Sequence, residues 1–227
     1  MSDPARDDAK RRAALAALAE LPPSGVIGLG TGSTARSFVE GLAELVRQGR
    51  SFQGVPTSEA TRRQACALGI PLLSDDGPWS IDLAIDGADE VDDGLELSKG
   101  AGGALTREKI VSFAARRTVI VCDARKRVRR LGETMPVAIE ILAFGHATTL
   151  AHLSRLGQPT LRQRDGAPFR TDNQNLVVDL AIEPSDDPAA LDLALRALPG
   201  VVETGLFVGR ADVVLVAHPD RVERLTR

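Results

Sequence analysis

Apolar segments alternate with charge-bearing helical segments through residue 131, and this alternation predicts an α/β domain. Buried strands are expected where the apolar runs lie, at residues 25–30, 52–56, 81–85 and 118–123. Helices are expected at residues 5–20, 34–47, 58–68 and 106–116. The first of them ends before Pro22 and Pro23, which cannot continue a helix. Strands that alternate with helices favour a Rossmann-like, mainly parallel sheet with helices on both faces.

Beyond Gly132 the pattern becomes that of a small α+β domain. It predicts strand, helix, strand, strand, helix and strand at residues 137–142, 147–156, 160–163, 176–181, 188–198 and 201–206. This βαββαβ order is typical of a ferredoxin-like domain. A last apolar strand, 212–217, follows too closely to begin another domain, so we expect it to return to the first sheet. The predicted organisation is an α/β domain of residues 1–131 and 207–227 with an inserted ferredoxin-like domain of residues 132–206.

The charge and hydropathy of the chain limit the kinds of partner that it is expected to bind. With 28 basic and 31 acidic residues, the net charge of −3 indicates no basic face for nucleic acid or for an anionic membrane. No apolar run reaches the ~18 residues of a membrane span, and the N-terminal segment lacks the apolar core of a signal peptide. Cys66 and Cys122 form no CxxC pair, and we expect both to be buried thiols in the cytoplasm.

The segment GLGTGSTA, residues 28–35, lies where the first strand meets a helix. Its glycines allow the backbone to direct several N–H groups at an anion, and the hydroxyls of Thr31, Ser33 and Thr34 add donors. Ser33 stands where a dinucleotide-binding GxGxxG needs glycine, and the GK[ST] of a nucleotide P-loop is absent. A bound phosphate and an ordinary capped turn both remain compatible with this motif.

The segment DGADEVD, residues 86–92, follows a buried strand. Asp86 and Asp89 are therefore expected at the carboxyl end of the sheet, where open α/β folds bind ligands. Catalytic carboxylates, a solvated acidic turn and a metal site are the alternatives, although the spacing does not match a calcium loop.

The segment KGAGGALTREK, residues 99–109, places Lys99 beside glycines and Glu108 early in a helix. Lysine occurs only at positions 10, 99, 109 and 126, against 24 arginines, so each lysine is informative as a compact point donor. A solvated helix start is the alternative. Because all three segments lie at strand-to-helix crossings, we expect them to meet in one crevice. Carboxylates and a lysine beside a glycine-rich loop favour acid–base chemistry on a phosphorylated substrate.

The motifs GTGSTA, DGADE, KGAGGALTREK and DARK, in this order and spacing, resemble ribose-5-phosphate isomerase of the A type. The resemblance covers nearly the whole chain, including TDNQNLVVDL at residues 171–180. It implies an α/β domain with a ferredoxin-like insertion and no metal or cofactor. It also implies a phosphosugar substrate and a homodimer or higher homo-oligomer. The implied reaction interconverts ribose 5-phosphate and ribulose 5-phosphate through a cis-enediolate in the pentose phosphate pathway.

The resemblance also implies substrate contacts by the three loops and by one lysine after the fourth strand. These residues are Thr31, Gly32, Ser33, Thr34, Asp86, Gly87, Ala88, Asp89, Lys99, Gly100, Ala101, Gly102 and Lys126. Glu108 is implied as the proton acceptor. The chemistry then suits Lys99 as oxyanion stabiliser, Asp89 as proton shuttle between the two oxygens, and Asp86 as an aid to ring opening.

Two positions depart from the family pattern. Arg125 stands where the family usually has serine before Lys126. Gln174 replaces the glycine of a TDNGN turn, at a position where we expect a positive φ.

Three other functions fit parts of the pattern. Another phosphosugar enzyme, such as an amino-sugar-phosphate deaminase-isomerase, would differ in its substrate profile. A sugar-phosphate sensor would need a DNA-binding module, for which the residues before 25 leave no room. Coenzyme A transfer uses a catalytic glutamate in a larger assembly.

Overall fold

A computed structural model describes residues 4–227 of the chain, and its contacts divide into two compact units. Unit 1 contains the residues up to 88, 107–126 and 210–227. Unit 2 contains residues 89–106 and 127–209. Within residues 4–227, no helix combines the length and the hydropathy needed to cross a bilayer.

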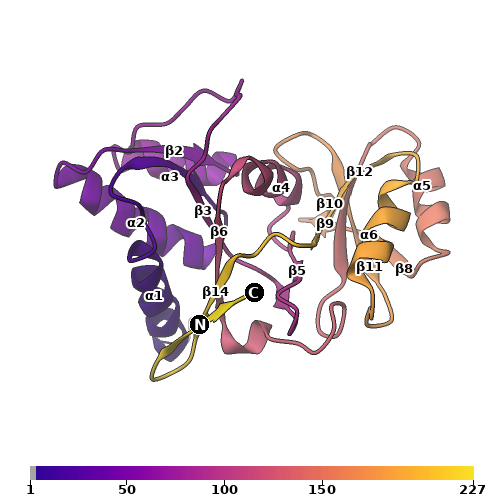
Figure 1. Ribbon diagram of the computed structural model, residues 1–227. Coiled ribbons are helices and arrows are strands. Elements are labelled where there is room, and N and C mark those ends of the chain that lie inside the picture. The colour runs from indigo at the N-terminus through magenta and orange to yellow at the C-terminus, as the bar shows by residue number, and fades with distance from the viewer. Residues whose placement is uncertain (1–3) are drawn as a thin grey trace. The chain divides into compact units, whose positions relative to one another are not determined.

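Unit 1 is built on a six-stranded sheet with the order β15-β14-β6-β3-β1-β2 (Figure 1). Its strands are β1 (Gly25–Leu29), β2 (Phe52–Pro56), β3 (Leu83–Asp86), β6 (Thr118–Asp123), β14 (Val213–Ala217) and β15 (Val222–Thr226). All neighbours are parallel except β15, which runs antiparallel to β14. The predicted mainly parallel sheet is confirmed, and the last apolar strand returns to it beside β6.

Helices cover both faces of this sheet because successive residues of a strand point to opposite sides. The helices are α1 (Pro4–Leu18), α2 (Ser33–Arg47), α3 (Glu59–Ala67) and α4 (Leu105–Ala114). Leu83 and Ile85 of β3 belong to the apolar cluster that α1 and α2 complete, and Figure 1 shows these two helices beside the strands. Ala84, between them, belongs to a second cluster with Val111 of α4.

Unit 2 contains a four-stranded antiparallel sheet with the order β12-β7-β11-β8. Its elements are β7 (Val137–Ile141), α5 (His146–Leu153), β8 (Gln158–Leu161), β11 (Leu176–Ala181), α6 (Pro188–Arg196) and β12 (Val201–Thr204). In order of appearance the strands lie fourth, first, third and second. The predicted βαββαβ ferredoxin-like arrangement is therefore confirmed. A buried apolar cluster that includes Ile139, Val178 and Leu195 forms its core.

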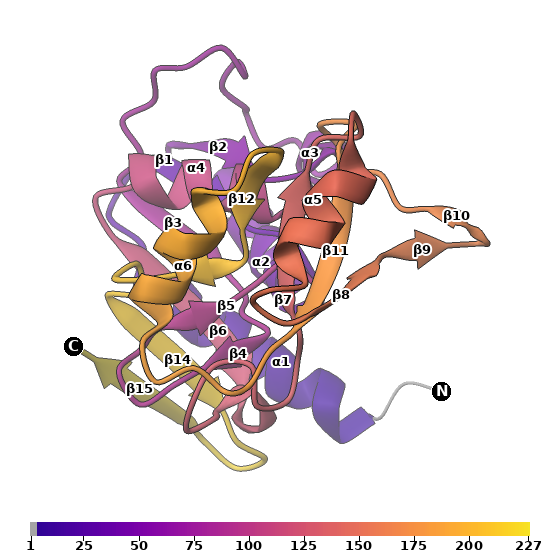
Figure 2. The ribbon, with the colours of Figure 1, turned by 90° about the vertical axis from the view of Figure 1, so that its right-hand side faces the viewer.

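Several short strands of unit 2 were not expected. The strands β4 (Glu90–Val91), β5 (Leu97–Ser98) and β13 (Leu206–Phe207) form a three-stranded sheet. The hairpin of β9 (Gln163–Arg164) and β10 (Ala167–Pro168) projects beyond β8 and β11, as Figure 2 shows.

The division into units differs from the expected domain boundaries, which placed residues 89–106, 127–131 and 207–209 in the larger domain. Two sets of contacts explain the difference. First, β5 pairs with β13. Second, the fully buried carboxylate of Glu90 accepts hydrogen bonds from the backbone of Gly132 (2.7 Å), Thr134 (2.6 Å) and Met135 (2.9 Å).

A second buried carboxylate, Glu140, organises the turn at residues 171–175. It accepts hydrogen bonds from the hydroxyl of Thr171 (2.9 Å) and the amide of Asn175 (2.8 Å). The hydroxyl of Thr106, in the first turn of α4, donates to it at 2.6 Å. Gln174 in this turn has φ +66°, which confirms the positive φ expected at this position from the sequence.

The expectation that both cysteines are buried holds for Cys122 and is wrong for Cys66. The inner face of α3 presents Thr61 and Ala65 to the core. Cys66 follows Ala65 by one position, about 100° further around the helix, and is exposed.

An ion-pair network within unit 1 joins the end of α1 to the sheet. The carboxylate of Glu20 accepts hydrogen bonds from the guanidinium groups of Arg117 (2.5 Å) and Arg224 (2.8 Å). These bonds, that of Arg224 first, hold the pKa of Glu20 below its usual range.

Glu20→Gln is expected to lower the free energy of unfolding by about 1 kcal/mol at neutral pH. A carboxyl group whose folded pKa lies below its unfolded value stabilises the fold only when it is ionised. The difference between wild type and variant therefore shrinks as the pH falls below about 4.3. Urea unfolding at a series of pH values measures this difference. Glu40→Gln, at an exposed position of α2, is the control. A difference that does not vary with pH would contradict the expectation.

Candidate active site

The loop between β1 and α2 depends on two glycines. A Cβ on Gly30 would lie 2.3 Å from Oδ1 of Asp86, so only glycine allows the strand end to approach this carboxylate. Gly32, the residue before α2, has φ +110°. Gly32 and Ser33 are exposed, and Thr34 is half-buried. The start of a 15-residue helix is thus open to an anion.

Asp86, the last residue of β3, is buried at the carboxyl end of the sheet. Its Oδ1 accepts hydrogen bonds from the backbone N–H of Thr31 (3.1 Å) and of Gly87 (2.7 Å). The loop after β1 and the segment that begins at Asp86 are therefore joined by hydrogen bonds to the Asp86 carboxylate.

A cluster of hydroxyl groups behind this loop was not expected from the sequence. The hydroxyl of Thr31 lies 2.8 Å from that of Thr57 and donates to Ser58 at 2.9 Å. Thr61 donates to the carbonyl of Gly30 at 2.9 Å. The only signal in the sequence was the run TSEAT after the second strand, whose Ser58 also caps α3 by accepting from the Thr61 N–H.

Glu108 lies in the first turn of α4 and is 6% exposed. A carboxylate at this end of a helix is favourable because of the helix dipole. The neighbouring Arg107 donates to Glu59 of α3 at 2.8 Å, and this bond is the main reason that the pKa of Glu59 is lowered. This ion pair connects the first turn of α4 to α3 within unit 1.

Lys126 ends the short 3₁₀ turn η1 (Ala124–Lys126) after β6 and is half-buried. The unusual Arg125 before it is exposed, and its guanidinium binds the Asp123 carboxylate at 3.1 and 3.2 Å. The Arg125 side chain is thus paired with the carboxylate of Asp123, two residues earlier in the chain.

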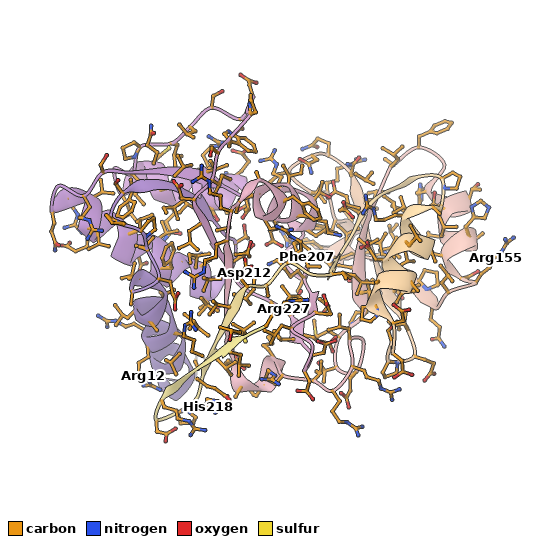
Figure 3. All side chains as sticks on the ribbon, in the orientation of Figure 1. Arg12, Arg155, Phe207, Asp212, His218 and Arg227 are labelled. Carbon is orange, nitrogen blue, oxygen red and sulfur yellow. The ribbon has the colours of Figure 1, made fainter. Side chains whose placement is uncertain are left out.

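In unit 2, Asp89 and the loop after β5 are bound to each other. The backbone N–H of Asp89 donates to the Ser98 carbonyl, and its Oδ2 accepts from the Ala101 N–H, both at 2.8 Å. Lys99 is 5% exposed, and its N–H donates to the Gly205 carbonyl at 2.8 Å. Its Nζ lies 5.4 Å from the centre of the Phe207 ring, which Figure 3 labels.

The predicted site residues thus fall into one group in each unit. Unit 1 contains Thr31, Gly32, Ser33, Thr34, Asp86, Gly87, Ala88, Glu108 and Lys126, and unit 2 contains Asp89, Lys99, Gly100, Ala101 and Gly102. Direct hydrogen bonds join Thr31, Asp86 and Gly87 in the first group and Asp89 to Ala101 in the second. Within residues 11–227, whose side chains the structure describes, no three His, Cys, Asp or Glu side chains lie in a group that could hold a metal ion.

A family model described as ribose 5-phosphate isomerase A (phosphoriboisomerase A) matches residues 53–221. Ribose-5-phosphate isomerase A of Synechococcus sp. (strain JA-3-3Ab) is 46% identical over 223 residues, which cover 96% of this chain and 97% of the relative. The protein of the same name from Roseiflexus castenholzii is 47% identical over 220 residues, which cover 95% and 94%.

Solved structures agree with this similarity. A D-ribose-5-phosphate isomerase in complex with phospho-erythronic acid superimposes with a TM-score of 0.94 at 38% identity, covering 97% of this chain and 99% of that one. Ribose 5-phosphate isomerase A from Methanocaldococcus jannaschii gives a TM-score of 0.93 at 36% identity, with the same coverage.

Gly30→Ala is expected to destabilise the protein by about 1–3 kcal/mol, because the new methyl group must displace the Asp86 carboxylate or the strand end. Gly87→Ala is a matched control on the other side of the same carboxylate. Its Cβ would meet nothing closer than the Val121 carbonyl at 3.8 Å, and we expect a change of less than about 1 kcal/mol. Urea unfolding of both variants tests the difference, and equal stabilities would contradict this account of Gly30.

Proposed function

The chain belongs to the ribose 5-phosphate isomerase A family, and from that membership we propose how its own residues divide the reaction between them. The protein is an aldose–ketose isomerase of the pentose phosphate pathway that interconverts D-ribose 5-phosphate and D-ribulose 5-phosphate. This reaction moves a proton between C2 and C1 of the open-chain sugar, and a cis-enediolate lies between the two carbonyl forms. It therefore needs a base, a stabiliser for the developing oxyanion, and donors for the phosphate.

Glu108 is the base in this proposal, removing the proton from C2 and returning it to C1. The burial of its side chain in the first turn of α4 supports the role, since a carboxylate kept from bulk water holds an abstracted proton for the second transfer. A positioned base contributes on the order of 10²–10⁴ in rate, so other groups must lower the barrier further.

Lys99 stabilises the negative charge that develops on the sugar oxygens. The observation that carries this assignment is the burial of its side chain, at 5% exposure, because a fixed ammonium acts more strongly where water is excluded. Asp89 moves the proton between the two oxygens. Its hydrogen bond from the Ala101 N–H keeps it beside the loop that begins at Lys99.

Asp86 assists ring opening, and the loop at residues 31–34 binds the phosphate together with Lys126. The exposed backbone at Gly32 and Ser33, at the start of α2, supports the phosphate role. The remaining substrate contacts in this proposal are Gly87, Ala88, Gly100, Ala101 and Gly102.

A related isomerase is known in complex with phospho-erythronic acid, whose carboxylate spreads negative charge over two oxygens as an enediolate does. We expect that acid to inhibit this enzyme.

We also propose that the enzyme acts in the cytoplasm as a homodimer or higher homo-oligomer. Two cysteines without a disulfide support the reducing compartment. Exposed apolar side chains in unit 2, Phe144 (94%) and Leu193 (73%), support association between copies. Sedimentation velocity of the purified protein tests the oligomer, and a monomer at all concentrations would refute it.

Proton NMR in D₂O, with a chelator present, tests the mechanism directly. We expect ribulose 5-phosphate to form from ribose 5-phosphate, with deuterium appearing at the transferred position when the base exchanges its proton with solvent. Turnover that stops when the chelator is added would contradict a base-only mechanism. Binding of the sugar phosphate without turnover would favour a sensor.

Glu108→Gln is expected to lower kcat by about 10²–10⁴-fold while KM changes little, because the amide keeps the shape of the side chain and cannot accept the proton. Glu40→Gln makes the same chemical change on the exposed surface of α2 and is expected to behave as wild type. Steady-state assays of both variants measure the effect. Near-normal turnover of Glu108→Gln would remove Glu108 from the mechanism.

A further inference from the structure

Arg162, the residue after β8, reaches the loop that contains Lys99. Its Nη1 donates to the carbonyl oxygens of Gly100 (2.8 Å) and Ala101 (3.2 Å). Its Nε donates to Oδ2 of Asp179 on β11 at 2.9 Å, and its Nη2 pairs with the other carboxylate oxygen. The Arg162 side chain is 15% exposed. Its bonds to Asp179 and to the Gly100 carbonyl are partly buried, whereas its bond to the Ala101 carbonyl lies at the surface.

Together with the bonds from Arg162, two further hydrogen bonds hold the backbone of this loop. The N–H of Lys99 donates to Gly205, and that of Ala101 donates to Asp89, both at 2.8 Å. The N–H groups of Lys99 and Ala101 are thus bound by the Gly205 carbonyl and the Asp89 carboxylate. Two successive carbonyls of the loop are bound by Arg162. Only a guanidinium, with its planar array of donors, can bind a carboxylate on one edge and two carbonyls on another.

The ring of Phe169 packs against both the loop and the arginine. A Cβ on Gly103 would lie 2.3 Å from this ring, which shows how closely the loop approaches it. The guanidinium of Arg162 lies 5.8 Å from the ring centre, and that of Arg164 lies 4.3 Å from it. Arg164 shares the ring contact, but its side chain is exposed, and the hydrogen bonds to the Gly100 and Ala101 carbonyls described above come from Arg162.

We propose that Arg162 is a positioning residue of the isomerisation. By binding the Gly100 and Ala101 carbonyls, it fixes the main chain that carries the Lys99 ammonium and the Ala101 N–H donor to Asp89. Asp179 in turn holds the guanidinium in the orientation that reaches both carbonyls. In this way β11, which carries Asp179, and β8, which precedes Arg162, help to position Lys99 for the reaction. This inference rests on the proposed roles of Lys99 and Asp89.

Arg162→Ala is expected to lower kcat by about 10–100-fold with KM within a few-fold of wild type, because a loosely held Lys99 no longer meets the developing oxyanion. Arg164→Ala is the matched control. It removes the same charge and a contact with the same ring, and leaves the loop carbonyls bound, so its kcat is expected to match wild type. Full kcat in Arg162→Ala would overturn the proposal.

Chemical rescue separates positioning from a loss of fold. Millimolar guanidinium chloride is expected to restore part of the kcat of Arg162→Ala, relative to the same concentration of sodium chloride, and to leave Arg164→Ala and Glu108→Gln unchanged. Rescue that is absent while circular dichroism reports a native fold would count against the proposal.

Arg162→Lys provides the test if the alanine variant does not fold. An ammonium lacks the planar fork and cannot bind Asp179 and both carbonyls together, so we expect reduced kcat with an unchanged KM in a folded protein. Wild-type kcat in this variant would overturn the proposal.

The proposed function fails by a different result. Wild-type activity in Lys99→Met would remove the loop from the chemistry and overturn both proposals. Inactive Lys99→Met beside fully active Arg162 variants would overturn only the role of Arg162.

Discussion

The loops of this protein are organised by the need of buried carboxylates for hydrogen bonds. An ionised oxygen removed from water is costly unless donors replace the lost hydration, and backbone N–H groups of irregular segments are the donors at hand. Asp86 thereby gathers the loop after β1, and Glu90 gathers residues 132–135. Glu140 gathers the turn at residues 171–175 through side-chain donors, the hydroxyl of Thr171 and the side-chain amide of Asn175. Each of these segments without regular structure is therefore held by hydrogen bonds to a buried carboxyl group.

The same principle, with the charges reversed, explains how the second unit holds the loop that contains Lys99. The guanidinium of Arg162 collects carbonyl oxygens, whereas Asp89 collects an N–H of the same loop. The loop therefore has its donors and acceptors bound on opposite sides. The side chain of Lys99 is then the part of this loop that can still move. This suits the role proposed for Lys99, in which its ammonium group meets negative charge as that charge develops on the substrate.

The long buried strands could be predicted from the sequence because their apolar residues form nearly continuous runs, as in β6 or β11. It did not reveal β4, β5 or β13, since two residues have no period and form a sheet only through partners distant in the chain. For the candidate site, the motifs predicted residues whose roles stay a prediction, and Gln174 was correctly expected at a positive φ. Arg162 and the hydroxyl cluster at Thr57, Ser58 and Thr61 escaped notice because their roles depend on contacts that no local pattern records.

The chain passes from one unit to the other at residues 88–89, 106–107, 126–127 and 209–210. Three of these crossings adjoin candidate site residues: Asp89, Glu108 and Lys126. Recombination that moved the ferredoxin-like strands as one cassette, residues 127–209, would leave behind β4, β5 and the loop of Lys99. Exchange of that cassette alone would separate β13 from its partner β5, so a recombination that keeps the three-stranded sheet intact has to move residues 89–106 together with residues 127–209.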